Sequence, residues 1–128
     1  MSKSEPKRVL LVDDEPSILA TFRPILEGIG CDVQVAQSAK EALTKIAAEE
    51  FELIITDVRM ETPSAGYEVV RAARSHGPKP AVAVLTAFPL TRSQCIQAGA
   101  DAVFVKGAGQ SIPEMLRTIE ELLTRPAE

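Results

Sequence analysis

Two adjacent carboxylates, Asp13 and Asp14, directly follow the apolar run Val9–Val12. Like charges within a few ångströms raise each other's pKa, so this arrangement costs free energy unless something offsets the repulsion. A hard cation such as Mg²⁺ would do so, because it prefers oxygen ligands. The pair therefore indicates a cation site, and an acidic, solvated turn at a strand end is the ordinary alternative.

Short apolar runs alternate with longer amphipathic segments along the chain, which predicts strands alternating with helices. The expected strands are Val9–Val12, Asp32–Ala36, Leu53–Thr56, Ala81–Leu85 and Ala102–Val105. The expected helices are 16–29, one opening at a capping box on Ser38, 65–75, a short one opening at a capping box on Thr91, and 111–123. Continuously apolar strands between helices argue for an α/β fold, a five-stranded parallel sheet covered on both faces.

Polar side chains follow four of these strands at their carboxyl ends, where ligands gather in parallel sheets. Asp13 and Asp14 follow the first strand, Asp57 the third, Thr86 the fourth and Lys106 the fifth. Each alone has an ordinary explanation, such as a helix cap for Asp57 or a surface position for Lys106. Together they predict three carboxylates, one hydroxyl and one amine at a single edge of the sheet.

This pattern resembles the receiver domain of response regulators, the phosphoryl-accepting half of two-component signalling. The resemblance runs from Val9 to about Leu123, and the matching segments are Val9–Glu15, Ile54–Met60, Leu85–Ala87, Ala98–Asp101 and Val103–Lys106. It implies a doubly wound, flavodoxin-like (βα)5 fold with strand order 2-1-3-4-5. We expect one domain over 8–124, a disordered lead-in over 1–7 and a short tail over 125–128.

The resemblance also implies a metal site and a phosphoryl acceptor. Asp57 would take the phosphoryl group as an acyl phosphate. Asp14 and Asp57 would hold Mg²⁺ directly, together with the backbone carbonyl of Arg59, and Asp13 would hold it through water. Mn²⁺ is a second candidate for the same ligands.

Three more residues, and Arg59 a second time, receive roles from the same resemblance. Lys106 would neutralise charge on the transferring phosphoryl group, and Thr86 would donate its hydroxyl to a phosphoryl oxygen as the conformational switch. Arg59 and Phe88 lie two residues after Asp57 and Thr86, at positions that tune hydrolysis of the acyl phosphate in the family. A bulky ring at 88 and a cation at 59 predict a long-lived phosphorylated state.

The chain departs from the family pattern next to the site. Glu61 stands where the family usually has proline, and Gly66 comes later than usual, so the loop after Asp57 is slightly longer. Gly107 replaces the proline that normally follows Lys106. A cis bond before a non-proline residue costs about 2.5–4 kcal/mol, so we expect a trans bond and a less firmly aimed Lys106.

Two departures concern the switch and its surface. Val103 occupies the position of the family's switch aromatic, and Phe104 follows it. Alternation along a strand puts these neighbours on opposite faces, so Phe104 cannot replace the missing ring. The segment from Thr86 to Gly99 is also shorter than usual, which suggests a pairing geometry outside the family's common dimer.

The leading interpretation is a stand-alone receiver that accepts a phosphoryl group from a histidine kinase or phosphotransfer protein and signals by altered binding to a downstream protein. Its own chemistry would be Mg²⁺-dependent self-phosphorylation and self-dephosphorylation rather than turnover of a substrate. The alternative is a degenerate receiver that acts as a phosphorylation-independent interaction module. Two other classes are argued against. An aspartate-nucleophile phosphatase would need an Asp-x-Asp motif on the first strand, and a nucleotide-binding fold would need a glycine-rich loop after Val12; the sequence contains neither.

Composition narrows the partners and the location. The net charge is −4 and no basic stripe is visible, which argues against direct nucleic-acid binding. No apolar run approaches the roughly 20 residues needed to span a bilayer. The two cysteines, Cys31 and Cys95, fit reduced, partly buried residues of a cytoplasmic protein, and the single histidine, His76, is expected to be solvated. We expect a monomer or weak dimer.

Overall fold

The computed structural model describes residues 6–75, 80–87, 92–107 and 111–124. It contains one sheet of five parallel strands in the order β2-β1-β3-β4-β5, which is the predicted order. The strands are β1 (Lys7–Val12), β2 (Cys31–Ala36), β3 (Leu53–Thr56), β4 (Ala81–Thr86) and β5 (Ala102–Val105). The predicted doubly wound α/β fold is therefore confirmed.

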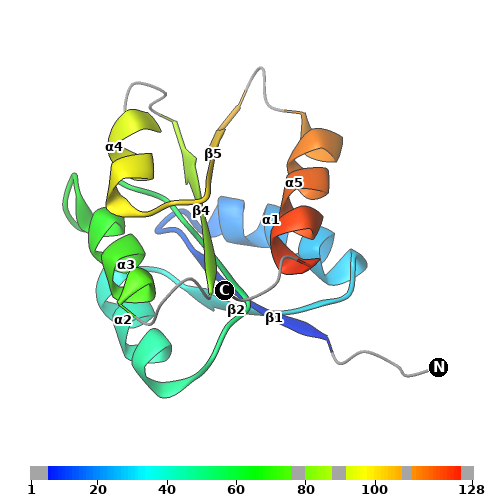
Figure 1. Cartoon of the computed structure of the whole chain (residues 1–128), viewed down its shortest axis with the longest axis horizontal. Helices are drawn as coiled ribbons and strands as arrows, with labels where there is room; N and C mark the ends of the chain where they lie inside the picture. The colour runs from blue at the N-terminus through cyan, green and yellow to red at the C-terminus, as the bar shows by residue number, and fades with distance from the viewer. Residues whose placement is uncertain (1–5, 76–79, 88–91, 108–110, 125–128) are drawn as a thin grey trace.

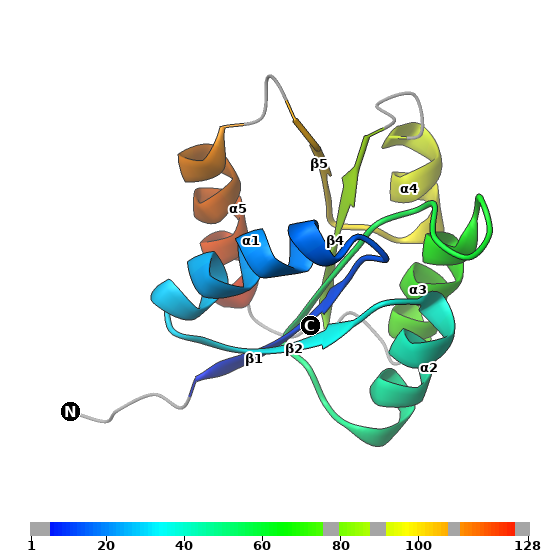
Figure 2. The same ribbon diagram turned by 180° about the vertical axis from the view of Figure 1, so that it is seen from behind.

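Helices cover both faces of the sheet (Figures 1 and 2). They are α1 (Pro16–Gly28), α2 (Ala39–Ala48), α3 (Ala65–Arg74), α4 (Arg92–Ala98) and α5 (Ile112–Thr124). α1 and α5 lie against one face, and α2, α3 and α4 lie against the other. This covering explains why β3 and β4 read as continuous apolar runs, because both faces of these central strands are buried.

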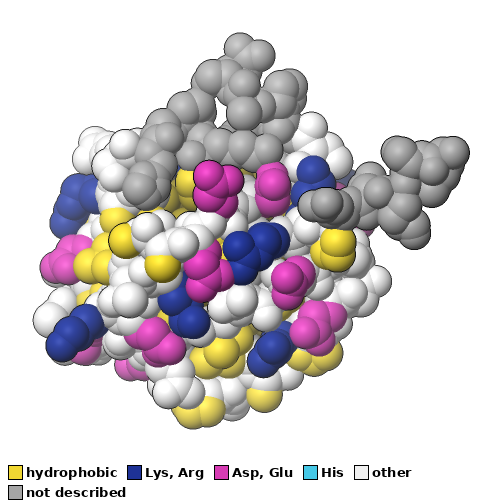
Figure 3. All heavy atoms as spheres, turned by 90° about the horizontal axis from the view of Figure 1, so that it is seen from below, with side chains coloured by type: hydrophobic (Ala, Val, Ile, Leu, Met, Phe, Trp, Pro, Cys, Tyr) yellow, Lys and Arg dark blue, Asp and Glu magenta, His cyan; other side chains and the backbone are white. Residues whose placement is uncertain are grey.

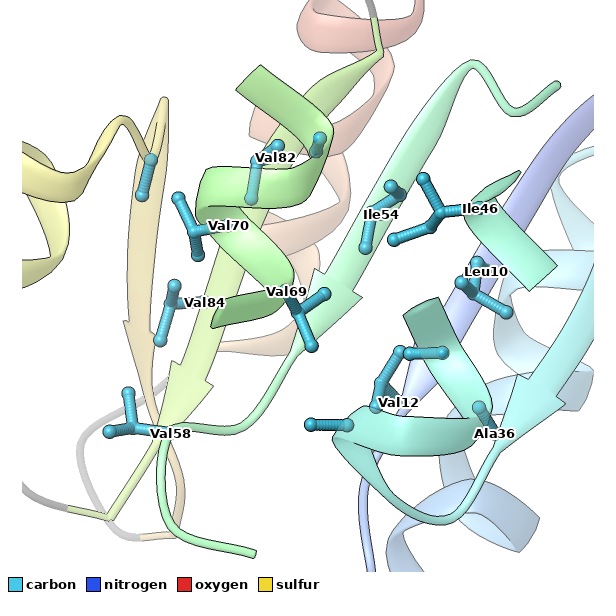
Figure 4. Packing of buried hydrophobic residues seen from close by; sticks show 14 of the residues in the cluster. Leu10, Val12, Ala36, Ile46, Ile54, Val58, Val69, Val70, Val82 and Val84 are labelled. Atoms are coloured by element: carbon cyan, nitrogen blue, oxygen red, sulfur yellow. The ribbon is translucent and has the colours of Figure 1, made fainter. Parts of the chain in front are cut away.

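The core is divided by the sheet into two apolar clusters. One joins the strands to α2, α3 and α4, where valines and isoleucines of the strands and helices meet (Figure 4). The other joins the strands to α1 and α5. Val103 belongs to the first cluster and Phe104 to the second, so the prediction that they point to opposite faces is confirmed.

β1 begins earlier than the apolar run predicted, at Lys7, which falls at the end of the expected lead-in. Arg8 explains the extension. Its carbonyl accepts a hydrogen bond from the Glu52 amide at 2.8 Å, and its guanidinium lies 5.1 Å from the centre of the Phe51 ring and pairs with Glu49. A charged side chain with these partners can extend a strand at the edge of the core.

The capping box at Ser38 is present in modified form. The Ser38 hydroxyl accepts a hydrogen bond from the Glu41 amide at 3.0 Å, as predicted. The Glu41 carboxylate, however, accepts from the amide of Gln37 at 2.8 Å rather than from that of Ser38. The box proposed at Thr91 and the solvated His76 lie outside the described residues.

The surface seen from below in Figure 3 carries Lys and Arg side chains interspersed with Asp and Glu side chains. In the part of the chain that the structure describes, no helix has the length and apolar character needed to cross a membrane. Cys31 and Cys95 are both buried and are not joined in a disulfide bond.

Candidate functional site

Asp13 and Asp57 are held in place by backbone hydrogen bonds that continue the sheet beyond its strands. The Asp13 amide donates to the Ala36 carbonyl at 3.0 Å, and the Asp57 amide donates to the Val12 carbonyl at 3.1 Å. Each carboxylate therefore follows a fully paired strand and has little backbone freedom. Both residues are buried, with exposed fractions of 1% for Asp13 and 6% for Asp57.

Three carboxylates meet at this edge of the sheet. Oxygens of Asp13, Asp14 and Asp57 all lie within 4.8 Å of one another. Asp14 is exposed, so the cluster opens to solvent on its side. The strand-end argument predicted this convergence, and the structure brings the three residues together as expected.

Lys106 enters the cluster from the end of β5. Its Nζ lies 2.9 Å from Asp57 Oδ2 and 2.9 Å from Asp13 Oδ2, and it donates to Glu15 Oε1 at 3.0 Å. Only 13% of the lysine side chain is exposed. The three carboxylate contacts aim Lys106 at the cluster, although the sequence had suggested a looser lysine next to Gly107.

Gly107 itself has a φ of 87°, a backbone conformation that glycine adopts readily and proline cannot. The amide of Lys106 donates to the Thr86 carbonyl at 2.8 Å, which fixes the lysine backbone just before this glycine. The glycine therefore permits a backbone conformation after the lysine that proline would exclude.

The electrostatics of the site show how crowded it is. Burial raises the pKa of the Asp13 carboxyl, and this effect outweighs the opposing contacts with Lys106 and the Glu15 amide. Burial alone would lower the pKa of Lys106, but its hydrogen bonds to Asp57, Asp13 and Glu15 raise it well above its usual range. Lys106 is thus cationic, and its single ammonium group faces the three carboxylates of Asp57, Asp13 and Glu15.

Thr86 is the last residue of β4 and is fully buried. It lies two residues beyond Val84, which pairs with Thr56, the residue before Asp57. The sheet register therefore puts Thr86 at the same edge as the carboxylates. Arg59 is exposed in the loop after β3, and Phe88 lies outside the described residues.

The loop between β3 and α3 (residues 57–64) packs tightly against the site. The Gly66 amide donates to the Val58 carbonyl at 2.8 Å. A Cβ at Gly66 would lie 2.6 Å from Val58 Cα and closer still to the Asp57 carbonyl oxygen. Only glycine allows α3 to begin this close to the backbone that follows β3.

Glu61, in the same loop, reaches across to the N-terminus of α2. Its two carboxylate oxygens accept hydrogen bonds from the amides of Ala39, at 2.9 Å, and Lys40, at 3.0 Å. Desolvation alone would raise the pKa of Glu61, but these amide donors lower it below its usual value. The extra carboxylate noted in the sequence therefore has two partners more than twenty residues away.

Besides these contacts of Glu61, two features of the site were not predicted. Glu15 contacts Lys106 although 91 positions separate them in the chain. The only signal was its place as the third acidic residue after the first strand. Gly66 was noted only for its position, and its contact with the Asp57 backbone depends on how α3 packs.

The donor set fits a small, hard cation. All the converging ligands are carboxylate oxygens, and octahedral Mg²⁺ with bonds of about 2.1 Å places its ligand oxygens about 3–4 Å apart. The 4.8 Å limit on the spread of Asp13, Asp14 and Asp57 suits two carboxylates bound directly and one through water. A second positive charge would also offset the repulsion that Lys106 leaves uncompensated.

A cavity of about 630 Å³ lies elsewhere, between the end of α2 and the start of β3, with Ile46, Phe51, Ile54 and Pro80 among its lining residues. None of the residues that converge at the carboxyl edge lines it. The candidate site is therefore separate from this cavity and lies at the carboxyl edge of the sheet, where Asp14 is exposed.

Comparison with known proteins agrees with this geometry. The response regulator receiver domain family model matches residues 9–120. The chain is 36% identical to the response regulator MprA of Mycolicibacterium vanbaalenii, over 94% of this chain and 48% of that protein. It is 37% identical to a gliding motility regulatory protein of Myxococcus xanthus, over 78% of this chain and 13% of that protein. The chain thus spans less than half the length of these relatives.

Among solved structures, the chain is similar to the response regulator TrrA of Thermotoga maritima, whose structure is a complex with Mg²⁺ and beryllofluoride. The TM-score is 0.80 at 31% identity, covering 91% of this chain and 98% of that one. Sequence motifs, sheet topology and the acidic edge all lead to the same assignment. The chain belongs to the response regulator receiver domain family.

Proposed function

We propose that this receiver accepts a phosphoryl group on Asp57 in a Mg²⁺-dependent reaction and passes the signal on by changing its binding to another protein. The observation that carries the proposal is the convergence of three carboxylates within 4.8 Å, with the Lys106 ammonium 2.9 Å from Asp57 Oδ2. Asp57, Asp14 and the Arg59 carbonyl would hold the ion, and Asp13 would hold it through water. Mn²⁺ has ligand preferences that would suit the same oxygens.

The proposed step is an in-line displacement at phosphorus. A carboxylate oxygen of Asp57 attacks the phosphoryl group, a P–O bond forms, and the bond from phosphorus to the donor nitrogen or oxygen breaks. The electron pair of the broken bond leaves with the donor, a histidine ring of a kinase or phosphotransfer protein, or acetate from acetyl phosphate. The bound cation supplies positive charge that screens the anionic acceptor from the anionic phosphoryl group.

The chain's own residues orient and neutralise the reactants. The Val58 amide donates to Asp57 Oδ1 at 2.7 Å, and Lys106 donates to Oδ2, so the acceptor carboxylate is held from both sides. Lys106 already lies where charge on a phosphoryl group on Asp57 would need compensation. Thr86, buried at the same edge, would reorient its hydroxyl toward a phosphoryl oxygen.

Slow loss of the phosphoryl group is a further part of the proposal. Arg59, exposed beside Asp57, can pair with phosphoryl oxygens, and Phe88 would hinder the attacking water. Replacing Phe88 with serine should then speed hydrolysis of the acyl phosphate. Unchanged decay of the phosphorylated protein would contradict this part.

The partners follow from the same chemistry. The donor would be a histidine kinase or phosphotransfer protein, and the acceptor of the signal would be a downstream protein, with no direct contact to nucleic acid or membrane. From the sequence we also predict that the protein acts as a stand-alone receiver, that it acts in the cytoplasm, and that it is a monomer or weak dimer.

Intact mass measurement after incubation with Mg²⁺ and acetyl phosphate or phosphoramidate tests the proposal. We expect a gain of one phosphoryl mass, which is absent without Mg²⁺ and in Asp57→Ala. Asp32→Ala is the matched control, because Asp32 is an exposed aspartate, the second residue of β2, away from the site; this variant should be phosphorylated normally.

The degenerate interaction module predicts a different result. A folded protein that gains no mass with either small donor, and none with candidate kinases, would contradict the proposal and favour that module. A gain that persists in Asp57→Ala would show that another residue accepts the phosphoryl group and would contradict Asp57 as the single acceptor.

A further inference from the structure

The loop from Asp57 to Ser64 is fastened at two places. Near its start, the Val58 carbonyl accepts from the Gly66 amide at 2.8 Å. Further along, the Glu61 carboxylate accepts from the amides of Ala39 and Lys40 at 2.9 and 3.0 Å. The first contact ties the loop to α3, and the second ties it to α2.

Arg59 and Met60 lie between these two points. The Met60 amide donates to the Thr62 carbonyl at 3.0 Å, which is a bond within the loop itself. Glu61 therefore provides a link from this part of the loop to a rigid element. The backbone carbonyl of Arg59 is the proposed metal ligand. Arg59 therefore lies between two anchored residues, Val58 before it and Glu61 after it.

The contact is specific in chemistry. An anion at a helix N-terminus is favoured by the unpaired amides and by the helix dipole. The Ser38 hydroxyl accepts a hydrogen bond from the Glu41 amide, and the Glu61 carboxylate accepts from the amides of Ala39 and Lys40. The amide donors in the first turn of α2 are therefore shared between the helix cap and the loop. Because the carboxylate accepts two hydrogen bonds, one on each oxygen, the orientation of the side chain is also fixed, as it would not be by a single bond.

We propose that Glu61 is a positioning residue, which ties the β3–α3 loop to α2 and so holds the Arg59 carbonyl where Mg²⁺ needs it. This inference rests on the proposed function, since it concerns the same metal site. Glu61 does not touch the cation itself. It acts through the backbone on which one ligand is carried.

The test compares the Mg²⁺ dissociation constants of the wild-type chain and Glu61→Ala, Glu61→Gln and Glu41→Ala, measured by isothermal titration calorimetry without a phosphoryl donor. Glu41 is the matched control, because its carboxylate binds an amide at the same helix end, that of Gln37, but makes no link to the loop. Urea unfolding of each variant reports separately on stability.

Glu61→Ala should bind Mg²⁺ about tenfold more weakly, the lower end of the effect of residues that support metal ligands. Glu61→Gln, which keeps one acceptor oxygen, should lie between Glu61→Ala and the wild type. Glu41→Ala should bind like the wild type, even if both alanine variants lose similar stability. Amide exchange at Ala39 and Lys40 should quicken in Glu61→Ala.

Equal Mg²⁺ affinity in the wild type and Glu61→Ala would overturn the positioning role and leave the proposed function intact. An equal loss in Glu61→Ala and Glu41→Ala would also overturn it, because the effect would then come from charge at the helix end. If the wild-type chain itself bound no Mg²⁺, the proposed function would fail, and this inference with it.

Discussion

At the scale of single residues, the acidic edge is a local conflict between stability and chemistry. Asp13 is almost fully buried beside Asp57, and its pKa is raised because burial penalises its charged form. Lys106 offsets part of this cost through its contacts with both carboxylates. Groups held in this way are typical of functional sites, where charge is gathered for a ligand rather than for folding.

Asp13→Asn should therefore make the metal-free protein more stable at neutral pH. Asparagine keeps an acceptor oxygen for Lys106 and removes a buried negative charge. Urea unfolding without Mg²⁺ measures the change. Asp32→Asn is the control, since that exposed carboxylate has only a 3.9 Å pairing with Arg8 and should change stability by less than about 0.5 kcal/mol. A lower free energy of unfolding in Asp13→Asn would contradict the claim that the buried charge of Asp13 destabilises the metal-free protein.

The same residue gives a pH dependence with a defined sign. Because the folded pKa of Asp13 is raised above its ordinary value of 3.8, the folded state binds more protons than the unfolded state between these two values. The contribution of Asp13 to stability therefore falls as pH rises from 3.8 through the folded pKa. Comparing urea unfolding of the wild type and Asp13→Asn across this range should show that this fall is missing in the variant.

Sequence reasoning found the residues that strand ends position and missed those that depend on side-chain packing. Asp13, Asp57 and Lys106 follow strands directly, so parallel topology alone brings them to one edge. Glu15 reaches Lys106 only through the conformations of two long side chains. Glu61 accepts hydrogen bonds from amides at the start of α2, and no local sequence pattern in the β3–α3 loop predicts this contact.

At the scale of elements, the packing of α3 on β3 sets the geometry of the β3–α3 loop. Gly66 is the point of closest approach, because the space that a side chain would occupy is filled by the backbone of Asp57 and Val58. The hydrogen bond from the Gly66 amide to the Val58 carbonyl holds the helix there. A change at Gly66 must therefore move the helix, the loop or both.

Gly66→Ala should lower the free energy of unfolding by about 2 kcal/mol or more, because the added Cβ meets backbone that cannot rotate away. Gly28→Ala is the matched control. It is also a helical glycine, but its added Cβ would have nothing within 4 Å, so stability should stay equal or rise by about 0.5–1 kcal/mol. Urea unfolding measures both, and similar values for the two variants would contradict the close approach.

The elements themselves were largely predictable, and their ends less so. Buried strands are apolar without interruption, so Leu53–Thr56 and Ala102–Val105 were bounded as the structure has them. β1 and β2 begin earlier, at Lys7 and Cys31, because these two residues pair with each other in the register of the two strands. Tertiary pairing of this kind leaves no mark in local composition.

At the scale of the whole molecule, the candidate metal site joins the ends of three strands, of which β1 and β3 are neighbours and β5 lies beyond β4. Asp13 and Asp14 follow β1, Asp57 follows β3, and Lys106 follows β5. A cation bound there would link segments far apart in the sequence and would bind the folded chain in preference to the unfolded one. Binding should therefore raise global stability.

Mg²⁺ at about one hundred times its dissociation constant should add about 2.7 kcal/mol to the free energy of unfolding. Asp14→Asn should lose this gain, since it removes a proposed direct ligand while its exposed position leaves the core intact. Thermal unfolding with and without MgCl₂, with NaCl at the same ionic strength as control, measures the effect. An equal gain in NaCl would mean general screening of charge rather than a bound ion.

The central claim is that Asp57 carries the phosphoryl group as an acyl phosphate, and hydroxylamine trapping tests it most directly. The chain is incubated with Mg²⁺ and acetyl phosphate, treated with hydroxylamine, digested and mapped by mass spectrometry. We predict a hydroxamate on Asp57, because hydroxylamine attacks the acyl carbon of an acyl phosphate and releases phosphate. A hydroxamate at another carboxylate, or a phosphoryl group that survives hydroxylamine on a hydroxyl side chain, would contradict the account.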